Sequence, residues 1–263
     1  MSDFIILGLL GPAGTGKDLV ADRFAHHNLV KVAFADPIKR FLRKAFDLSY
    51  DQLWGESDKR DKEFDINESW WLNAVDSFNA ASTEIITEVL DPGVKVNAFI
   101  KLYEWFTRLR STYGTKISPR IILQTLGTEW GREVDPLMWA RYGHRIANKL
   151  RSGYSYTYHE GLFVDNTAWE NPYAGVVIPD HRFINEVRYT NEQPGTAMIR
   201  LKRPAYPGKE VGIAGHKSEE EHKNIPDSMV DLVMELPEGI EKVHAIVDEV
   251  YANKEWMKPK SLL

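Results

Sequence analysis

The sequence contains no cysteine among its 263 residues. Disulfide bonds, thiolate metal sites and cysteine nucleophiles are therefore excluded, which fits a reducing compartment. The sequence also has no apolar run approaching the roughly 20 residues that a membrane-spanning helix needs. Its first residues, MSDFIILGLLG, carry no basic segment ahead of the apolar one, so we expect no signal peptide. Together these absences predict a cytoplasmic protein that has no membrane partner.

An excess of basic charge is also missing. Lys and Arg number 33 against 38 Asp and Glu, which gives a formal net charge of −5. Broad nucleic-acid binding usually needs a basic surface, so we expect no nucleic-acid partner. A small phosphorylated ligand stays compatible with this charge, because a few local cations suffice to bind it. The oligomeric state is left open, with a homodimer as one alternative.

Short apolar runs alternate along the chain with segments of helical periodicity. The predicted strands cover 4–10, 31–35, 175–179, 197–201 and 230–236. The predicted helices cover 17–26, 38–46, 96–110, 118–133, 136–150, 183–190 and 240–251. Asp36 and Pro37 are expected as N-cap and first residue of the second helix. This alternation is typical of an α/β fold with a parallel sheet.

We expect one domain over 1–263, in which two segments close over a site at the strand ends. Its parts are a core of 1–46 and 175–263, a largely helical insertion at 47–174 and a Gly/Pro-rich lid at 203–227. Within the insertion, 47–95 lacks clean periodicity and is expected to be a long irregular segment. Residues 151–174 are expected to form a loop or a small hairpin.

The stretch GPAGTGK at 11–17 directly follows the first predicted strand. Its Gly-x4-Gly-Lys spacing is that of a P-loop, in which backbone N–H groups wrap phosphates and the lysine reaches them. The candidate phosphate-binding residues are Gly11, Pro12, Ala13, Gly14, Thr15, Gly16, Lys17 and Asp18. The alternative is a glycine-rich turn with an exposed lysine. The strand before the stretch and the helix after it favour the P-loop.

Asp18 stands where a P-loop usually has the Ser or Thr that holds Mg²⁺. A carboxylate in a first helical turn is favoured by the helix dipole alone, but it is equally a hard ligand for Mg²⁺. Asp180 ends a predicted strand, as a magnesium-binding Asp does in many nucleotide-binding proteins, although a turn or cap role is the alternative. Arg182 and Glu186 follow four residues apart, a spacing that a simple ion pair would also explain.

The predicted helix 118–133 carries polar groups at three- to four-residue spacing, namely Arg120, Gln124, Thr128 and Arg132. Such a face is usually just solvated. Here two guanidinium groups suit phosphate, an amide suits a base edge, and Trp139 is available to stack, which favours a nucleotide site. Arg203 opens the predicted lid, where a cation could close on phosphates, and a charged surface loop is the alternative.

Several of these stretches together resemble a known family. They are GPAGTGKD at 11–18, ADPIKR at 35–40, ILQTLGTEWGR at 122–132, VIPDHRFINE at 177–186 and HKSEEEH at 216–222. In this order they resemble the bacteriophage deoxynucleoside monophosphate kinases, and the likeness covers nearly the whole chain. The resemblance implies a three-layer P-loop kinase fold around a five-stranded parallel sheet, with a helical monophosphate-binding insertion and a lid. It also implies transfer of the γ-phosphate of Mg²⁺-bound ATP to a deoxynucleoside monophosphate, in the host cytoplasm if the chain is of phage origin.

The resemblance also implies roles for the catalytic residues and the P-loop named next, whereas the other site residues are expected from their own chemistry. The expected catalytic residues are Lys17, Arg132, Asp180, Arg182 and Glu186. ATP is expected at the P-loop and Arg203, and Mg²⁺ at Asp18 and Asp180. The acceptor nucleotide is expected at Lys39, Arg120, Gln124, Arg132 and Trp139. Leu19 departs from the family pattern, where Thr is expected, so no hydroxyl at 18 or 19 can bind the metal.

Two other functions stay open. One is another P-loop kinase with a small acceptor, such as dephospho-coenzyme A kinase. The other is a regulatory or assembly protein that binds ATP without phosphorylating an acceptor. The arginines at 120, 132, 182 and 203 favour phosphoryl transfer, because a nucleotide sensor needs fewer cations that stabilise phosphate.

Overall fold

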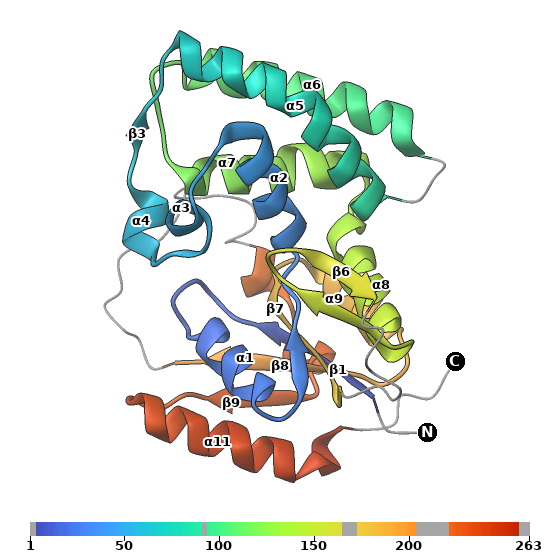
Figure 1. Cartoon of the computed structure of the whole chain (residues 1–263). Coiled ribbons are helices and arrows are strands. Elements are labelled where there is room, and N and C mark those ends of the chain that lie inside the picture. The colour runs from blue at the N-terminus through green and yellow to red at the C-terminus, as the bar shows by residue number, and fades with distance from the viewer. Residues whose placement is uncertain (1–3, 91–93, 165–172, 204–220, 258–263) are drawn as a thin grey trace. The chain divides into compact units, whose positions relative to one another are not determined.

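A computed structural model describes residues 4–90, 94–164, 173–203 and 221–257 (Figure 1). The chain separates into two compact units. Unit 1 comprises Met1–Phe34 and Gly143–Leu263, and unit 2 comprises Ala35–Tyr142. Among the described residues, no helix combines the length and the apolar character needed to cross a membrane.

Unit 1 is built on a five-stranded sheet with the order β2-β7-β1-β8-β9. The strands are β1 (Ile5–Leu10), β2 (Leu29–Lys31), β7 (Gly175–His181), β8 (Thr196–Lys202) and β9 (Leu232–Glu235). Every neighbouring pair is parallel. All six residues of the central strand β1 are buried, which explains its nearly continuous apolar sequence. The predicted five-stranded parallel sheet is confirmed.

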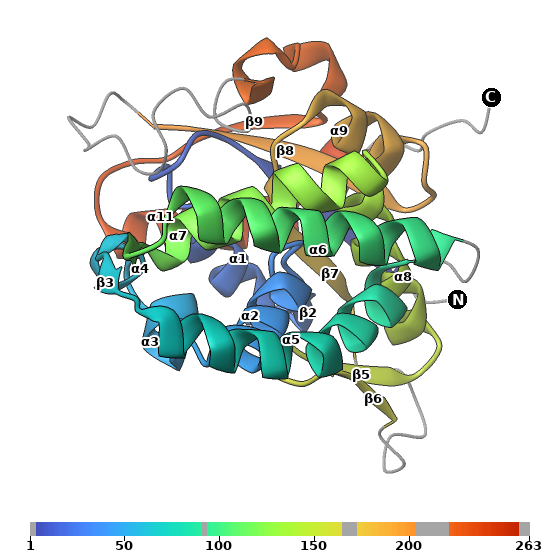
Figure 2. The same cartoon turned by 90° about the horizontal axis from the view of Figure 1, so that it is seen from above.

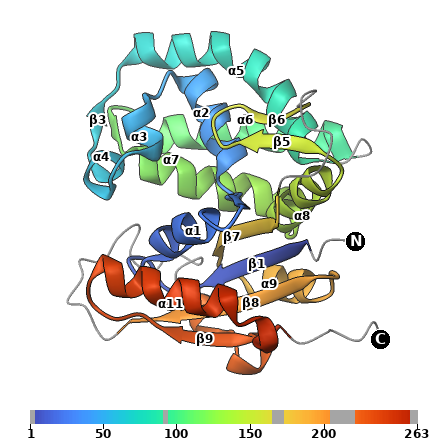
Figure 3. The same cartoon turned by 60° about the horizontal axis from the view of Figure 1, so that its bottom comes forward.

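Helices cover both faces of this sheet (Figure 3). On one face, α1 (Lys17–Ala25) and α11 (Ile240–Ala252) pack their buried residues, among them Phe24 and Val243, onto Leu7 and Ile199. On the other face, α9 (Ile184–Asn191) packs Val187 onto Leu10 and Met198. Gly143, in the part of α8 (Met138–Arg151) that belongs to unit 1, lies against Ile178. The predicted three-layer α/β fold is therefore confirmed.

The remaining parts of unit 1 are short. Strands β5 (Tyr154–Thr157) and β6 (Gly161–Val164) form an antiparallel hairpin inside the predicted loop or hairpin at 151–174. Of the predicted lid at 203–227, residues 204–220 lie outside the described residues. Its last part forms the 3₁₀ turns η3 (Glu221–Asn224) and η4 (Asp227–Met229), and a further 3₁₀ turn η5 (Lys254–Trp256) follows α11.

Unit 2 is mainly helical. Its elements are α2 (Asp36–Phe46), α3 (Tyr50–Trp54), α4 (Ser57–Asp61), α5 (Glu68–Val89), α6 (Lys95–Thr112), α7 (Pro119–Thr125), the π-helix η2 (Leu126–Arg132), and the paired strands β3 (Phe64–Asp65) and β4 (Lys116–Ile117). Helices α5 and α6 run side by side (Figure 2). Rings from α2, α5 and α6 meet in the core, where Phe46 contacts Phe78, Trp105 and Phe106.

The structure corrects the expected organisation of this region. Residues 47–95 are not irregular, because they include the 22-residue helix α5. Its buried Trp71, Ala74 and Phe78 follow helical spacing, but the 54% exposed Leu72 interrupts that pattern in the sequence. The compact unit runs from Ala35 to Tyr142, whereas the predicted insertion spans 47–174. Helix α2 belongs to unit 2 because its Phe41 packs on Phe78.

Three local predictions were wrong as well. The second strand is Leu29–Lys31 rather than 31–35. The N-cap of α2 is Ala35, and Asp36 is a buried first helical residue, so Asp36 is not the cap. The predicted helix 118–133 changes at Leu126 into the π-helix η2. A π-helix has more residues per turn than an α-helix, so the predicted polar face does not continue unchanged to Arg132.

Candidate functional site

The segment between β1 and α1 has the backbone of a phosphate-binding loop. Gly14 and Gly16 have φ angles of 79° and 93°, in the left-handed region that favours glycine. A Cβ atom on Gly11 would lie 2.9 Å from the carbonyl oxygen of Leu201, so only glycine fits this close approach. The hydroxyl of Thr15 donates a hydrogen bond of 2.8 Å to the carbonyl oxygen of Pro12 and closes the loop.

Lys17 extends back over this loop. Its Nζ donates hydrogen bonds of 2.7 Å to the carbonyl oxygens of Gly11 and Pro12. Lys17 is also the first residue of α1, whose N-terminus offers backbone N–H groups and the positive end of the helix dipole. A positive side chain and a helix N-terminus therefore meet at one loop, an arrangement whose charge suits a polyphosphate.

Asp180 lies at the carboxyl edge of the sheet, beside the start of this loop. In the register of β1 with β7, Leu10 pairs with His181, so the residue before His181 is level with the end of β1. Oδ1 of Asp180 accepts a hydrogen bond of 2.9 Å from the backbone N–H of Phe34. Strand β7 runs two residues past the predicted end at 179, so Asp180 is part of the strand rather than the turn after it.

Glu186 is the most buried of the predicted catalytic residues in unit 1, with 2% of its surface exposed. Its Oε2 accepts hydrogen bonds from the backbone N–H groups of Arg182, at 3.0 Å, and Phe183, at 3.2 Å. This carboxylate therefore caps the N-terminus of α9 and fixes the turn that carries Arg182. The geometry supports a structural role for Glu186, and a direct part in the chemistry stays a prediction.

Asp18 faces a cation. Its Oδ1 lies 2.9 Å from Nζ of Lys31, which also lies 2.8 Å from Oδ1 of Asp22. Burial lowers the pKa of Lys31, but the nearby Asp18 and Asp22 outweigh that effect and the pKa is raised. The side chain of Asp18 is 77% exposed. This pairing favours the helix-start role over the metal-binding role.

The donor set at this edge is compatible with Mg²⁺. Asp180 supplies a hard carboxylate ligand beside a loop that suits phosphates, and Mg²⁺ in such sites takes one or two carboxylates together with phosphate oxygens and water. Within the described ranges, no three His, Asp or Glu side chains gather into a metal site of their own. A metal held jointly with a bound nucleotide fits these residues better than a metal held by the protein alone.

A buried polar cluster lies behind Asp180 and had no sequence signal that we recognised. The hydroxyl of Thr190 in α9 lies 2.9 Å from Nε2 of His181 and 3.0 Å from Nε2 of His144. Burial lowers the pKa of His144 to about 4. Burial, and secondarily the neighbouring His144, lower the pKa of His181 to about 3. Both imidazoles are therefore neutral near pH 7.

Arg203 follows β8, the other neighbour of β1, and is half-buried. Unit 1 thus places the loop between β1 and α1, Asp180, Arg182 and Arg203 at the carboxyl edge of three adjacent strands. Ligands of parallel α/β sheets bind at this edge, where the strand order reverses.

The predicted acceptor residues lie in unit 2. Nε of Arg120 forms an ion pair with Asp61, and only 16% of the Arg120 side chain is exposed. Nη2 of Arg120 is buried and has no hydrogen-bond partner among the described residues. Gln124 follows on the same helix and is half-buried. Nζ of Lys39 lies 5.6 Å from the ring centroid of Trp54. Arg120 is therefore the acceptor candidate with the clearest unused hydrogen-bond capacity.

Arg132 is the last residue of the π-helix η2, and Trp139 follows it in α8. Nη1 of Arg132 donates to the carbonyl oxygen of Pro136 at 2.9 Å. Trp139 is 4% exposed and its Nε1 donates to the carbonyl oxygen of Gly127 at 2.8 Å. Its ring fills the space beside Gly131, where a Cβ atom would lie 2.2 Å from the indole. This geometry supports a packing role for Trp139, and its contact with a base stays a prediction.

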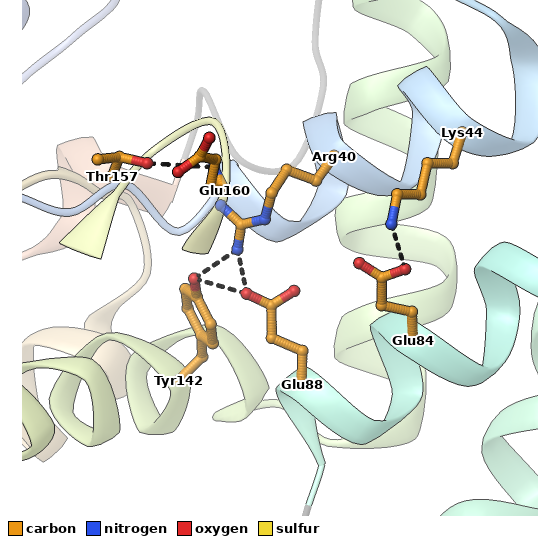
Figure 4. A network of polar contacts seen from close by, with 7 residues as sticks. All are labelled: Arg40, Lys44, Glu84, Glu88, Tyr142, Thr157 and Glu160. Carbon is orange, nitrogen blue, oxygen red and sulfur yellow. Dashed lines mark hydrogen bonds and ion pairs between the residues drawn. The ribbon is translucent and has the colours of Figure 1, made fainter. Parts of the chain in front are cut away.

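A second buried polar network in unit 2 was also missed (Figure 4). Nη2 of Arg40 pairs with Glu88 and donates to the hydroxyl of Tyr142 at 3.0 Å. The Tyr142 hydroxyl also lies 3.2 Å from Oε1 of Glu88. Arg40 is 7% exposed. The sequence shows Arg40 only as a charged residue in a short helix, and its partners are 48 and 102 residues away along the chain.

The chain is similar to one curated protein in particular. Over 230 residues it is 24% identical to a protein of Acanthamoeba polyphaga mimivirus named "putative deoxynucleotide monophosphate kinase". The similarity covers 87% of this chain and 88% of that protein. No family model matches the chain.

Proposed function

We propose that the chain transfers the γ-phosphate of Mg²⁺-bound ATP to a deoxynucleoside monophosphate. The observation that carries this proposal is the loop between β1 and α1, where Lys17 Nζ lies over the loop carbonyls next to the N-terminus of α1. The similarity to a protein named as a deoxynucleotide monophosphate kinase, over most of both chains, supports a nucleotide kinase role.

In this proposal, residues of unit 1 bind and orient ATP. The loop N–H groups and Lys17 hold the phosphates, and Arg182 and Arg203 neutralise charge that develops during transfer. Asp180 holds Mg²⁺ directly or through water, and the metal would neutralise the phosphate oxygens. Asp18 is a second candidate for the metal, although its pairing with Lys31 favours the other role. No general base is needed if the acceptor phosphate enters already ionised.

The acceptor nucleotide is assigned in this proposal to residues of unit 2. Arg120 and Arg132 suit its phosphate because guanidinium groups bind phosphate oxygens in a fixed geometry. Lys39 adds a further positive charge, and Gln124 supplies an amide for the base edge. Nη2 of Arg120 is buried and has no hydrogen-bond partner among the residues described. A phosphate oxygen would accept the hydrogen bond that this nitrogen can donate.

The test is a coupled assay of ADP release with deoxynucleoside monophosphates, ribonucleoside monophosphates and dephospho-coenzyme A as acceptors. We expect turnover with one or more deoxynucleoside monophosphates. Lys17→Ala should lower kcat/KM by about 100-fold or more without a change in thermal unfolding. The matched control is Lys202→Ala, because Lys202 is a half-exposed lysine that pairs with Asp227 at the end of β8.

Two outcomes would contradict the proposal. Turnover with dephospho-coenzyme A alone would identify another small-acceptor kinase. Slow ATP hydrolysis that no acceptor accelerates would identify an ATP-binding regulatory protein.

A further inference from the structure

We propose that Thr190, acting through His181 and Phe34, is a positioning residue for the carboxylate of Asp180. The inference rests on the proposed function, because it assigns Asp180 to the metal and phosphate site. It concerns only residues of unit 1.

The first step is the hydrogen bonding of Thr190. Thr190 and His181 are 0% exposed and His144 is 3% exposed, so water cannot replace a lost contact. The hydroxyl of Thr190 meets Nε2 of both imidazoles, at 2.9 Å and 3.0 Å. A hydroxyl carries one proton, so it donates to one neutral imidazole and accepts from the other. Both rings are therefore held in fixed orientations by one side chain.

The second step runs from His181 to Asp180. The two residues are neighbours at the end of β7, where the pairing with β1 is irregular between Gly8 and Leu10. Because regular pairing with β1 is interrupted here, the close packing of the His181 ring helps to fix the backbone that carries Asp180. A Cβ atom on Gly8 of the adjacent strand would lie 2.9 Å from Cε1 of His181, so the ring fills its space closely.

The third step is a second contact with the same carboxylate. The ring of Phe34 lies against the His181 ring, with centroids 4.9 Å apart. The backbone N–H of Phe34 donates to Oδ1 of Asp180 at 2.9 Å. Phe34 therefore touches the buried ring with its side chain and the carboxylate with its backbone. A shift of the His181 ring would move Phe34 and the hydrogen bond to Asp180 together.

The cluster of Thr190, His181 and His144 lies beside the two segments at which unit 1 connects to the rest of the chain. Phe34 is the last residue of unit 1 before the chain enters unit 2, and Gly143, just before His144, is the first after it returns. A Cβ atom on Gly143 would lie 2.8 Å from the Phe34 ring, so the two connecting segments meet at this cluster. Directional hydrogen bonds specify one arrangement of such segments, whereas apolar packing alone tolerates several.

The experiment measures Mn²⁺ binding by electron paramagnetic resonance in the presence of a non-hydrolysable ATP analogue, and so needs no acceptor. Thr190→Val removes the hydroxyl at nearly constant shape, and Thr190→Ser keeps it. The matched control is Thr196→Val, because Thr196 is also buried and its hydroxyl donates to the carbonyl oxygen of Gln193 at 2.9 Å, away from Asp180.

We expect Thr190→Val to weaken Mn²⁺ binding by about tenfold, while Thr190→Ser and Thr196→Val keep it within about twofold. Phe34→Leu removes the ring contact with His181 but keeps the backbone donor, and it should also weaken Mn²⁺ binding. This variant tests the inference even if Thr190→Val does not fold. Equal Mn²⁺ affinity in wild type, Thr190→Val and Phe34→Leu would overturn the inference. Normal Mn²⁺ binding by the wild type without turnover of any monophosphate would instead overturn the proposed function alone.

Discussion

Acid should destabilise the protein through His144. This imidazole is 3% exposed in the folded chain, and burial lowers its pKa from 6.5 to about 4. The groups that face it are the hydroxyl of Thr190, through which it meets His181, and the ring of Tyr189, whose centroid is 5.3 Å away. None of these groups supplies a negative charge that would stabilise imidazolium, so folding requires the neutral form.

The direction in which stability changes with pH follows from proton binding. At a pH above the ordinary pKa of 6.5, both the folded and the unfolded chain hold His144 neutral, and its contribution does not change with pH. As pH falls below that value, the unfolded chain binds a proton that the folded chain does not, so stability falls. Between about pH 7.5 and about pH 5 the loss from this single group is about 2 kcal/mol.

The assay is urea unfolding across this pH range for wild type, His144→Gln and a control. Gln keeps an amide near Thr190 but has no titrating group, so this variant should lose about 2 kcal/mol less on acidification than wild type. His26→Gln, which removes an exposed histidine, should lose as much as wild type. If the unfolding free energy of His144→Gln fell with pH as steeply as that of wild type, the reasoning would be refuted. His144 would then have the same pKa in the folded and the unfolded chain.

Three further predictions concern single side chains. Glu88→Ala should lower the free energy of unfolding, measured by urea titration, by about 3–5 kcal/mol, because it leaves Arg40 charged and buried. Glu84→Ala breaks an exposed ion pair and should lower it by at most about 1 kcal/mol. Gly16→Ala should destabilise by about 1–2 kcal/mol in thermal unfolding, because the φ of Gly16 is 93°. Asp18→Asn and Asp22→Asn, which both remove a partner of Lys31, should leave the Mg²⁺ concentration for half-maximal rate unchanged. An increase in Asp18→Asn alone would identify Asp18 as a metal ligand.

The parts of the fold that could be predicted from sequence are those set by local chemistry. The glycine-rich loop after β1 is recognisable because Gly14 and Gly16 adopt left-handed backbone, which few other residues do. The buried parallel strands are recognisable because burial on both faces demands a continuous apolar run, as in β1. Such requirements act within a few residues and therefore appear directly in the sequence.

The parts that could not be predicted depend on partners distant along the chain. Arg40 looks like a surface residue until Glu88 and Tyr142 are found beside it. The packing of Trp139, with its N–H on the carbonyl oxygen of Gly127 and its ring beside Gly131, is likewise not visible in the sequence. The change from α7 to the π-helix η2 shifts the phase of the polar face. Side-chain spacing along one helix contains none of this information.

The arrangement of carboxylates at the candidate site has an electrostatic consequence for the proposed function. A polyphosphate is repelled by uncompensated negative charge, and the stretch around the site contains Asp18, Asp180 and Glu186. The charge of Glu186 is offset by two backbone N–H groups at the start of α9, and that of Asp18 by Lys31. Oδ1 of Asp180 accepts a hydrogen bond from the backbone N–H of Phe34 at the end of its strand. In the proposed function a divalent cation at this carboxylate would offset its charge, and the incoming nucleotide would supply the remaining ligands for that cation.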